Sequence, residues 1–144
     1  MHHGAMWDCP VVVGQRIEDV LQLDAATIIA GAELLGDKNP LHRDMAFARG
    51  SRFGSLIACG PHAAGLHACM LPTYVTSLGH GVVGVEFTLQ YRQPILPDVP
   101  YAMWWQVATT EPRGRHWLAQ WFGAVGVGDA ESITGTGTVL ILEA

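Results

Sequence analysis

The sequence has few charged residues, few cysteines and no long apolar run. Of its 144 residues, 49% are hydrophobic and 15% are charged, which is enough apolar material for one globular domain. The longest apolar runs, such as residues 139–142, are far shorter than the roughly 20 residues that cross a bilayer. The three cysteines, Cys9, Cys59 and Cys69, lack the C-x-x-C spacing of zinc sites and redox pairs. We therefore predict one domain with no membrane span, whose cysteines are reduced and mostly buried.

Positive charge is scarce as well. The chain has 8 Lys and Arg residues against 13 Asp and Glu residues, and its net charge of -5 argues against general nucleic-acid binding. Four of the basic residues nevertheless cluster in one short stretch, namely Lys38, Arg43, Arg49 and Arg52. This cluster could bind a small polyanion such as coenzyme A, with Arg43, Arg49 and Arg52 as the phosphate contacts. It could equally be a solvated surface.

The first ten residues carry no recognisable targeting signal. They include two histidines but no Lys or Arg ahead of an apolar stretch, so they do not resemble a secretory signal. We therefore expect a cytoplasmic protein. Gly4 and Pro10 interrupt this stretch. We interpret residues 1–10 as a lead-in that could in part be artificial, and residues 11–144 as the domain.

The first half of the chain is predicted to be mostly helical. Residues 11–23 alternate loosely between apolar and polar, which indicates a strand or an extended lead-in. Asp24 is a suitable N-cap for a helix whose apolar positions recur at helical spacing, and Gly36 ends that helix. Asn39-Pro40 begins a second helix, because Pro suits the first helical position. We expect this second helix to reach Gly50.

A third helix is predicted to begin at Gly60-Pro61, which repeats the same start signal. The residues that follow, from Ala63 to Leu71, are small or apolar on nearly every face. A helix tolerates such a composition only where protein surrounds it. We therefore predict that this is the central buried helix of the domain, and that Pro72 kinks or ends it.

The second half of the chain is predicted to form a sheet. Four segments rich in β-branched and aromatic residues are separated by turn signals. Consecutive strands with short loops give a mainly antiparallel sheet, and the apolar helix would pack on one face of it. The predicted fold class is therefore α+β. The predicted strands are Val82 to Arg92, Tyr101 to Thr110, His116 to Val127 and Thr134 to Leu142.

The most informative stretch is residues 36–42, Gly-Asp-Lys-Asn-Pro-Leu-His. If Asn39 caps a helix that Pro40 opens, Asp37 lies just before that helix and His42 lies in its first turn. The positive end of the helix dipole then favours an ionised Asp37 and a neutral His42. A carboxylate beside a neutral imidazole can hold and deprotonate one water molecule. Either residue alone would more often be structural, but the combined pattern predicts a catalytic pair.

The start of the third helix could supply a second part of the same site. Unpaired backbone N–H groups at a helix start can stabilise the oxyanion that forms when a thioester carbonyl becomes an enolate. Because Pro61 has no N–H, the donor would be Gly60 or one of the amides that follow. On local grounds alone, Gly60 could equally be a simple cap.

Taken together, these motifs resemble the signature of the R-specific enoyl-CoA hydratases (hydratase 2, MaoC-like). The resemblance covers the central part of the chain, about residues 25–98. Its last run, Tyr-Arg-Gln-Pro-Ile-Leu-Pro-Asp, is similar to the family's R-x-x-P-hydrophobic-x-P-G-D pattern. The matching runs are residues 36–42, Phe47-Ala48, Phe53-Gly54, Ile57-Ala58-Cys59-Gly60 and residues 91–98.

The resemblance implies a hot-dog fold, in which an antiparallel sheet wraps a central helix, and a homodimer. It implies Asp37 and His42 as the catalytic dyad, Asn39 as a residue that shapes the site, and the Gly60 amide as part of the oxyanion hole. The implied substrate is an acyl-CoA or acyl-carrier thioester. Its trans-2-enoyl group would be hydrated to the (R)-3-hydroxyacyl product, or the product dehydrated, with neither a metal nor another cofactor.

Two positions depart from the family. The family usually has His where this chain has Cys59, and this puts one hydrogen bond near the dyad in doubt. It usually has Met or another non-proline residue where this chain has Pro61. We expect Pro61 to alter the entry into the third helix, and with it the substrate range, without touching the dyad.

Two other functions stay open on the sequence. A hot-dog thioesterase would share the fold and the thioester, but such enzymes usually carry Asp or Glu on or near the central helix. No carboxylate occurs between Asp44 and Glu86. A non-catalytic module that binds acyl thioesters would need neither Asp37 nor His42, so the intact pair counts against it.

The remaining histidines and the tryptophans are assigned to structure. A metal site built from His62, His67 and His80 has little support, because residues 62 and 67 are five apart and do not share a helix face well. The tryptophans could line a pocket, but we favour the core for all of them. They are Trp104, Trp105, Trp117 and Trp121.

Overall fold

An antiparallel sheet is the scaffold of the protein, which the computed structural model describes over residues 5–144. Its five strands follow the order β1-β3-β4-β5-β2, so the first two strands along the chain form the opposite edges. Every neighbouring pair is antiparallel. The strands are β1 (Arg16–Leu21), β2 (Val82–Tyr91), β3 (Tyr101–Arg113), β4 (His116–Val127) and β5 (Ala130–Ile141).

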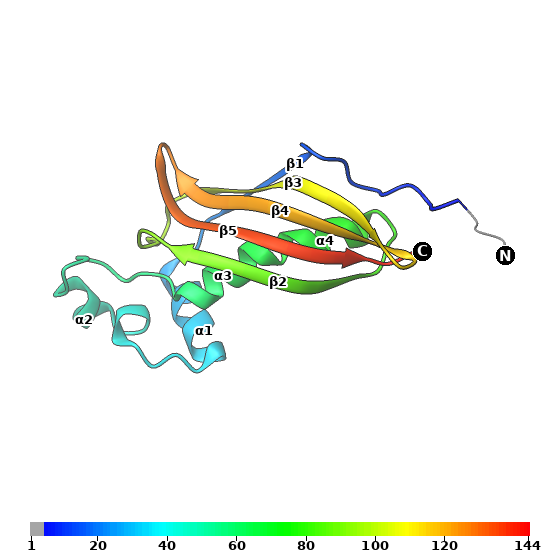
Figure 1. The fold of residues 1–144 in the computed structure, drawn as a ribbon. Helices are drawn as coiled ribbons and strands as arrows, with labels where there is room; N and C mark the ends of the chain where they lie inside the picture. The colour runs from blue at the N-terminus through cyan, green and yellow to red at the C-terminus, as the bar shows by residue number, and fades with distance from the viewer. Residues whose placement is uncertain (1–4) are drawn as a thin grey trace.

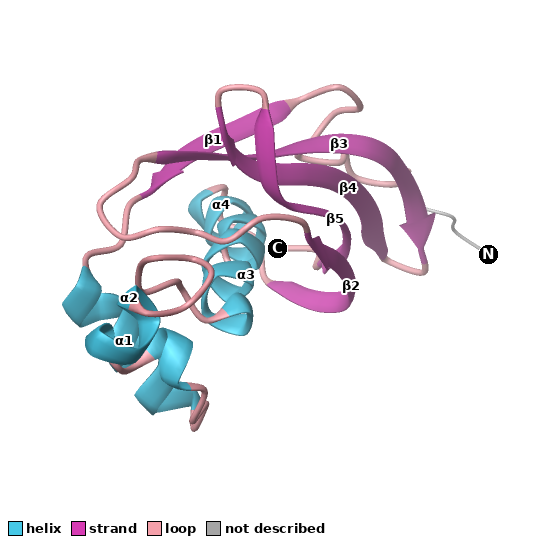
Figure 2. Ribbon diagram, turned by 90° about the vertical axis from the view of Figure 1, so that its left-hand side faces the viewer, coloured by secondary structure: helices cyan, strands magenta, loops and turns pink. Residues whose placement is uncertain are grey.

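The helices lie on the concave side of the sheet and at one end of it. α3 (Gly60–Ala68) and α4 (Met70–Ser77) follow each other beneath the curved sheet, as Figure 1 shows. α1 (Ala25–Leu35), the 3-10 turn η1 (Pro40–His42) and α2 (Met45–Arg49) gather at one end, below the sheet in Figure 2. A sheet wrapped around a central helical segment is the predicted hot-dog fold, and the α+β prediction is confirmed.

The four strands predicted in the second half are all present, but two hairpins are longer than predicted. β3 continues through Pro112 to Arg113, and β5 begins at Ala130. Two-residue turns explain the extra length. Gly114 and Gly128 begin these turns with φ values of 60° and 58°, a left-handed conformation that glycine adopts without a steric penalty and that matches the twist of paired strands.

Local capping sets both ends of α1, as predicted. Asp24 Oδ1 accepts a hydrogen bond from Thr27 N–H at 2.7 Å, which satisfies one of the free amides of the first turn. Gly36 then takes a φ of 71°, and its N–H and that of Asp37 bond back to the last turn of the helix. The chain therefore leaves α1 in a fixed direction directly before the dyad sequence.

The prediction of one continuous helix from Pro40 to Gly50 is wrong. The chain instead forms η1, breaks at Asp44, and starts again as α2. Asp44 has extended backbone angles, and its side chain accepts the Phe47 N–H at 3.0 Å. It thus acts as a second N-cap inside the segment, and Ser, Thr, Asn and Asp at such positions compete with helix continuation.

The third predicted helix is kinked rather than ended by Pro72. The break falls at Cys69, and the helix resumes as α4 with Pro72 inside it. A proline ring clashes with the carbonyl four residues earlier, which here belongs to Ala68, so the kink lies where proline places it. The prediction that protein surrounds this helix on every side is wrong for a single chain. Leu66 is 38% exposed and Cys69 is exposed, because the sheet covers only one face.

The core consists of two apolar clusters between the sheet and the helices. Trp105 and Trp121 are fully buried in the cluster between α4 and the sheet, which confirms the core assignment for these two. The cysteine prediction holds only in part: Cys59 is buried, Cys9 is half-buried and Cys69 is exposed. Within the described residues, no helix is long and apolar enough to cross a membrane.

The described part of the lead-in packs onto the sheet. Trp7 donates its indole N–H to the Arg115 carbonyl at 2.7 Å, and its own carbonyl accepts the Trp117 indole N–H at 2.9 Å. Its ring also stacks on His80, with the ring centres 4.9 Å apart. Residues 1–4 lie outside the described residues.

Candidate active site

Asp37 and His42 face each other at the end of the molecule where α1 and η1 meet. Asp37 follows the Gly36 cap of α1, and His42 is the last residue of η1. The distance from Asp37 Oδ2 to His42 Nε2 is 3.7 Å. The sequence prediction that the two side chains lie close together is confirmed.

A backbone contact determines which nitrogen of the neutral His42 ring carries the proton. His42 is 8% exposed, and its Nδ1 lies 2.8 Å from the Ile57 carbonyl oxygen. Because a carbonyl can only accept, Nδ1 carries the proton and donates it to Ile57. In the neutral ring the lone pair is then on Nε2, the nitrogen that faces Asp37.

Short hydrogen bonds, rather than a helix dipole, hold Asp37 in its ionised form. The Asn39 backbone N–H donates to Oδ1 at 2.9 Å and the Cys59 thiol donates to Oδ2 at 3.2 Å. These two contacts, together with the nearby His42 and Arg43, lower the pKa of Asp37 below its ordinary value. η1 has only three residues, so it is too short to supply the helix dipole that was expected from the sequence.

Asn39 acts here through its backbone. Its side chain accepts the Leu41 N–H at 3.1 Å and so caps η1, as predicted. Its backbone N–H supports the Asp37 carboxylate, and its side chain is not among the residues that line the pocket next to His42. Within the residues that the structure describes, Asn39 thus shapes the site by positioning Asp37.

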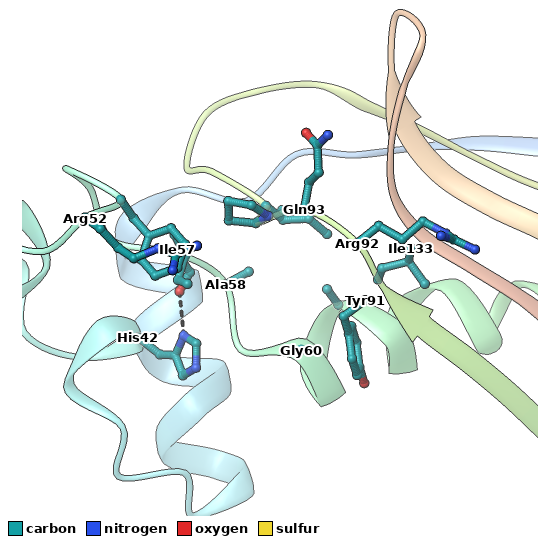
Figure 3. A pocket seen from close by; sticks show the side chains of 13 residues that line it. His42, Arg52, Ile57, Ala58, Gly60, Tyr91, Arg92, Gln93 and Ile133 are labelled. Carbon is teal, nitrogen blue, oxygen red and sulfur yellow. Dashed lines mark hydrogen bonds between the residues drawn. The ribbon is translucent and has the colours of Figure 1, made fainter.

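A pocket of about 350 Å³ opens beside His42, and its walls come from three parts of the chain. The segment before α3 contributes Arg52, Phe53, Ile57 and Ala58, α3 contributes Gly60 and Ala63, and β2, the loop after it and β5 contribute the rest. Figure 3 shows His42 and Tyr91 on opposite sides of the start of α3. The lining residues from β2, the loop after it and β5 are Tyr91, Arg92, Gln93, Pro94, Ile95 and Ile133.

Two lining residues, Tyr91 and Ile133, were not predicted from the sequence. These residues face each other in the β2–β5 ladder, so only strand pairing brings them to the dyad. Tyr91 could have been found, because it opens the 91–98 run that carries part of the resemblance. No local signal marks Ile133.

Gly60, the first residue of α3, lines this pocket. Pro61 has no N–H. Burial raises the pKa of the neighbouring Cys59 thiol, and the backbone of His62 acts in the opposite direction with a smaller effect. A Cβ on Gly60 would lie 3.0 Å from the Tyr91 ring, so glycine at this position lets the ring approach the backbone. The role of the Gly60 amide in an oxyanion hole stays a prediction.

The clustered basic residues do not converge on the pocket. Arg52 lines it, with its guanidinium 5.0 Å from the Phe53 ring centre. Arg43 instead turns back to Glu33, at 3.6 Å, and to the Asp37 carbonyl oxygen at 3.5 Å. Arg49 is exposed on α2 and is not a lining residue. Of the three arginines proposed as phosphate contacts, Arg52 alone borders this pocket.

The other histidines lie apart from the dyad. His67 is buried against Trp105, with ring centres 4.1 Å apart, and burial lowers its pKa. His80 contacts the Leu142 carbonyl at 3.1 Å. His62 packs over Gly31 of α1. Across residues 5–144, no group of three His, Cys, Asp or Glu side chains is arranged to hold a metal ion.

Part of the chain is similar in sequence to a known dehydratase. No protein-family model matches the chain. A stretch of 74 residues is 35% identical to the 3-hydroxybutyryl-CoA dehydratase of Methylorubrum extorquens. This stretch covers 51% of the chain and 46% of the dehydratase, so the match spans about half the length of that relative.

Two solved structures resemble the chain over nearly its whole length. The (R)-hydratase from A. caviae involved in PHA biosynthesis is 27% identical, with a TM-score of 0.78, over 90% of this chain and 96% of the hydratase. The MaoC-like dehydratase from Rhodospirillum rubrum is 23% identical, with a TM-score of 0.77, over 93% of this chain and 94% of that one. The resemblance predicted from the motifs is confirmed, and the named relatives are hydratases and dehydratases.

Proposed function

We propose that this chain, which is a MaoC-like hot-dog protein, hydrates a trans-2-enoyl thioester to the (R)-3-hydroxyacyl thioester and catalyses the reverse dehydration. The observation that carries the proposal is the pair of acceptors, Asp37 Oδ2 and His42 Nε2, which lie 3.7 Å apart, with His42 lining the pocket. The relatives with hydratase and dehydratase names support the same reaction. The thioester carrier, coenzyme A or a carrier protein, is left open.

The two acceptors suit one water molecule. A water between them can donate one hydrogen to each, which directs an oxygen lone pair outward, toward the β-carbon of a bound enoyl group. Attack forms the new C–O bond, one water proton passes to the dyad, and the electrons of the double bond move to the thioester as an enolate. A proton then adds to the α-carbon, so that the net change is the addition of H and OH.

The enolate oxygen needs a donor at the far end of the conjugated system. The Gly60 N–H is the amide at the start of α3 that is left for this role, and an amide aimed at developing charge can contribute strongly in a dry site. The pocket between Gly60 and the dyad provides the path for the acyl group. The apolar Ala63, Ile95 and Ile133 form its buried side.

The proposed chemistry uses side chains and one amide, with no metal or other cofactor. We therefore expect a chelator such as EDTA to leave the hydration rate unchanged after exhaustive dialysis, as measured on an enoyl-CoA. Loss of the activity on chelation and its return with zinc would contradict this part of the proposal. The cytoplasmic location expected from the sequence stays a prediction.

We also propose a homodimer. The ten residues of β2 form one edge of the sheet, and Val83 and Val85 on this edge are 48% and 57% exposed. An unpaired apolar edge is a liability that a second copy of the chain can cover. Light scattering at micromolar concentration tests the assembly, and a monomer would count against it.

The function is tested by following two signals on crotonyl-CoA, a four-carbon enoyl thioester. Hydration removes the absorbance of the conjugated thioester and releases no thiol, whereas a thioesterase releases free coenzyme A. We expect loss of the absorbance without thiol release, and formation of the (R) product on a chiral column. Thiol release at the same rate would favour the thioesterase, and binding without either signal would favour a non-catalytic module.

A further inference from the structure

We propose that Cys59 is a positioning residue for Asp37: its thiol ties the carboxylate to the first turn of α3 and holds Oδ2 toward His42. The catalytic meaning of this contact rests on the proposed function, but the contact itself does not. The position is the one where the sequence departs from the family's usual His, and the structure places a hydrogen-bond donor there.

The sulfur lies between a helix and the carboxylate. Cys59 is the N-cap of α3 and has no exposed surface. Its Sγ is 3.2 Å from Asp37 Oδ2. The thiol thus donates its hydrogen to Asp37, and the backbone of Cys59 joins this contact to the start of α3.

The contact completes the orientation of the carboxylate. Asp37 Oδ1 is held by the Asn39 N–H at 2.9 Å, and Oδ2 is held by Cys59. Oδ2 is also the oxygen that faces His42 Nε2. With one donor on each oxygen the group has little freedom to turn, whereas without the thiol only Oδ1 is anchored and Oδ2 can swing away from His42.

The charges around Asp37 keep the thiol in its donor form. Burial and the neighbouring Asp37 carboxylate raise the pKa of Cys59, so its sulfur keeps the proton. The other groups that face Asp37 are Arg43, whose charge favours the carboxylate, and His42, which favours it when its ring is protonated. A thiol is a weak donor, but a charged acceptor strengthens the bond.

A purely space-filling role makes a different prediction for two substitutions. Cys59→Ser keeps a donor of nearly the same size, whereas Cys59→Ala removes the donor. If Cys59 only fills space, both variants should behave alike at the active site. Cys69→Ala is the matched control, because Cys69 lies at the other end of α3 and is exposed.

The first test is kinetic, on crotonyl-CoA. We expect Cys59→Ala to lower kcat about tenfold with little change in KM, because orientation and not binding is lost. We also expect the acidic limb of its pH profile to move to higher pH, since Asp37 loses a hydrogen bond to its ionised form. Cys59→Ser should stay within about threefold of the parent, and Cys69→Ala should match it. Equal rates and profiles for the Ala and Ser variants, with both folded, would overturn the positioning role.

The second test does not depend on activity. In a Cys9→Ala, Cys69→Ala background, the S–H stretching band in the infrared spectrum reports on Cys59 alone. We expect a band lowered by the hydrogen bond to Asp37, which returns toward the free-thiol frequency in Asp37→Asn. A band already at the free-thiol frequency in the parent would overturn the proposal. A lowered band in a protein that hydrates no enoyl thioester would leave the contact standing and refute the proposed function.

Discussion

His42 and His67 are both buried, yet their surroundings give them opposite roles. Each has one ring nitrogen on a backbone carbonyl: His42 Nδ1 lies 2.8 Å from the Ile57 oxygen and His67 Nε2 lies 3.0 Å from the Trp104 oxygen. The difference lies in the second nitrogen. That of His42 faces Asp37 and borders the pocket, whereas that of His67 has no partner among the described residues and its ring stacks on Trp105.

Two features separate His42, the proposed catalytic histidine, from His67. Burial and a carbonyl contact are common to both residues, so neither distinguishes them. Of the two histidines, only His42 has a carboxylate partner and lines the pocket; the carboxylate comes from the segment between α1 and α3, whereas the pocket also needs the sheet. We therefore expect changes at His42 to affect the rate, and changes at His67 to affect folding.

The largest expected effect is on the rate of His42→Gln. Glutamine keeps a polar group but cannot take up a proton, and a general acid or base typically contributes about 10² to 10⁴-fold, or roughly 3 to 5 kcal/mol of barrier. We expect kcat on crotonyl-CoA to fall by that factor with KM changed little. The midpoint of urea unfolding should stay near that of the parent. A comparable loss of rate in a folded His67 variant would break the comparison.

The next effect is on stability and concerns His67→Ala. The substitution removes the stack on Trp105 and the hydrogen bond to the Trp104 carbonyl, and it leaves a cavity under the sheet. Replacing a large buried side chain by Ala typically costs about 2 to 5 kcal/mol. We expect a loss of this size in the free energy of urea unfolding. The kcat per folded molecule should be unchanged, and stability equal to the parent would contradict the structural role.

The smallest expected effect is the pH dependence that His67 adds to stability. Burial lowers its pKa in the folded protein below the ordinary value of 6.5, so the unfolded chain binds the proton more readily. Its contribution is therefore fully present above about pH 6.5 and is lost as the pH falls through the lower folded value. His67→Phe keeps an aromatic ring and cannot titrate. Urea unfolding between about pH 5 and 7 should show a shallower loss of stability in this variant, and parallel curves would exclude the effect.

The elements that the sequence predicted well are those set by local chemistry. Asp24 and Gly36 fix α1 through contacts within a few residues, and the alternating segments of the second half become strands. The proximity of Asp37 and His42 was predictable for the same reason, because only five positions separate them. The helix that fails, from Pro40 to Gly50, does so because Asp44 caps a new start inside it.

The parts of the site that the sequence missed depend on contacts between distant segments. Cys59 reaches Asp37 across 22 positions, and Tyr91 meets Gly60 only because β2 ends beside α3. Conversely, residues that are near in sequence can make contacts in different parts of the structure. Arg43 and Arg52 lie in one basic cluster, yet Arg43 turns to Glu33 while Arg52 borders the pocket. Spacing along the chain therefore predicts which site residues lie together only when they belong to one turn or one loop.

We expect Asp37 and His42 to act as a unit on one water molecule. A double-mutant cycle on crotonyl-CoA tests this expectation most directly. The cycle compares kcat of Asp37→Asn, His42→Gln and the double variant, with folding checked by circular dichroism. We expect each single variant to lose about 10² to 10⁴-fold, and the double variant to be scarcely worse than either, since groups that act together are not additive. Single variants that are folded and hydrate the substrate at near the parent rate would contradict the account.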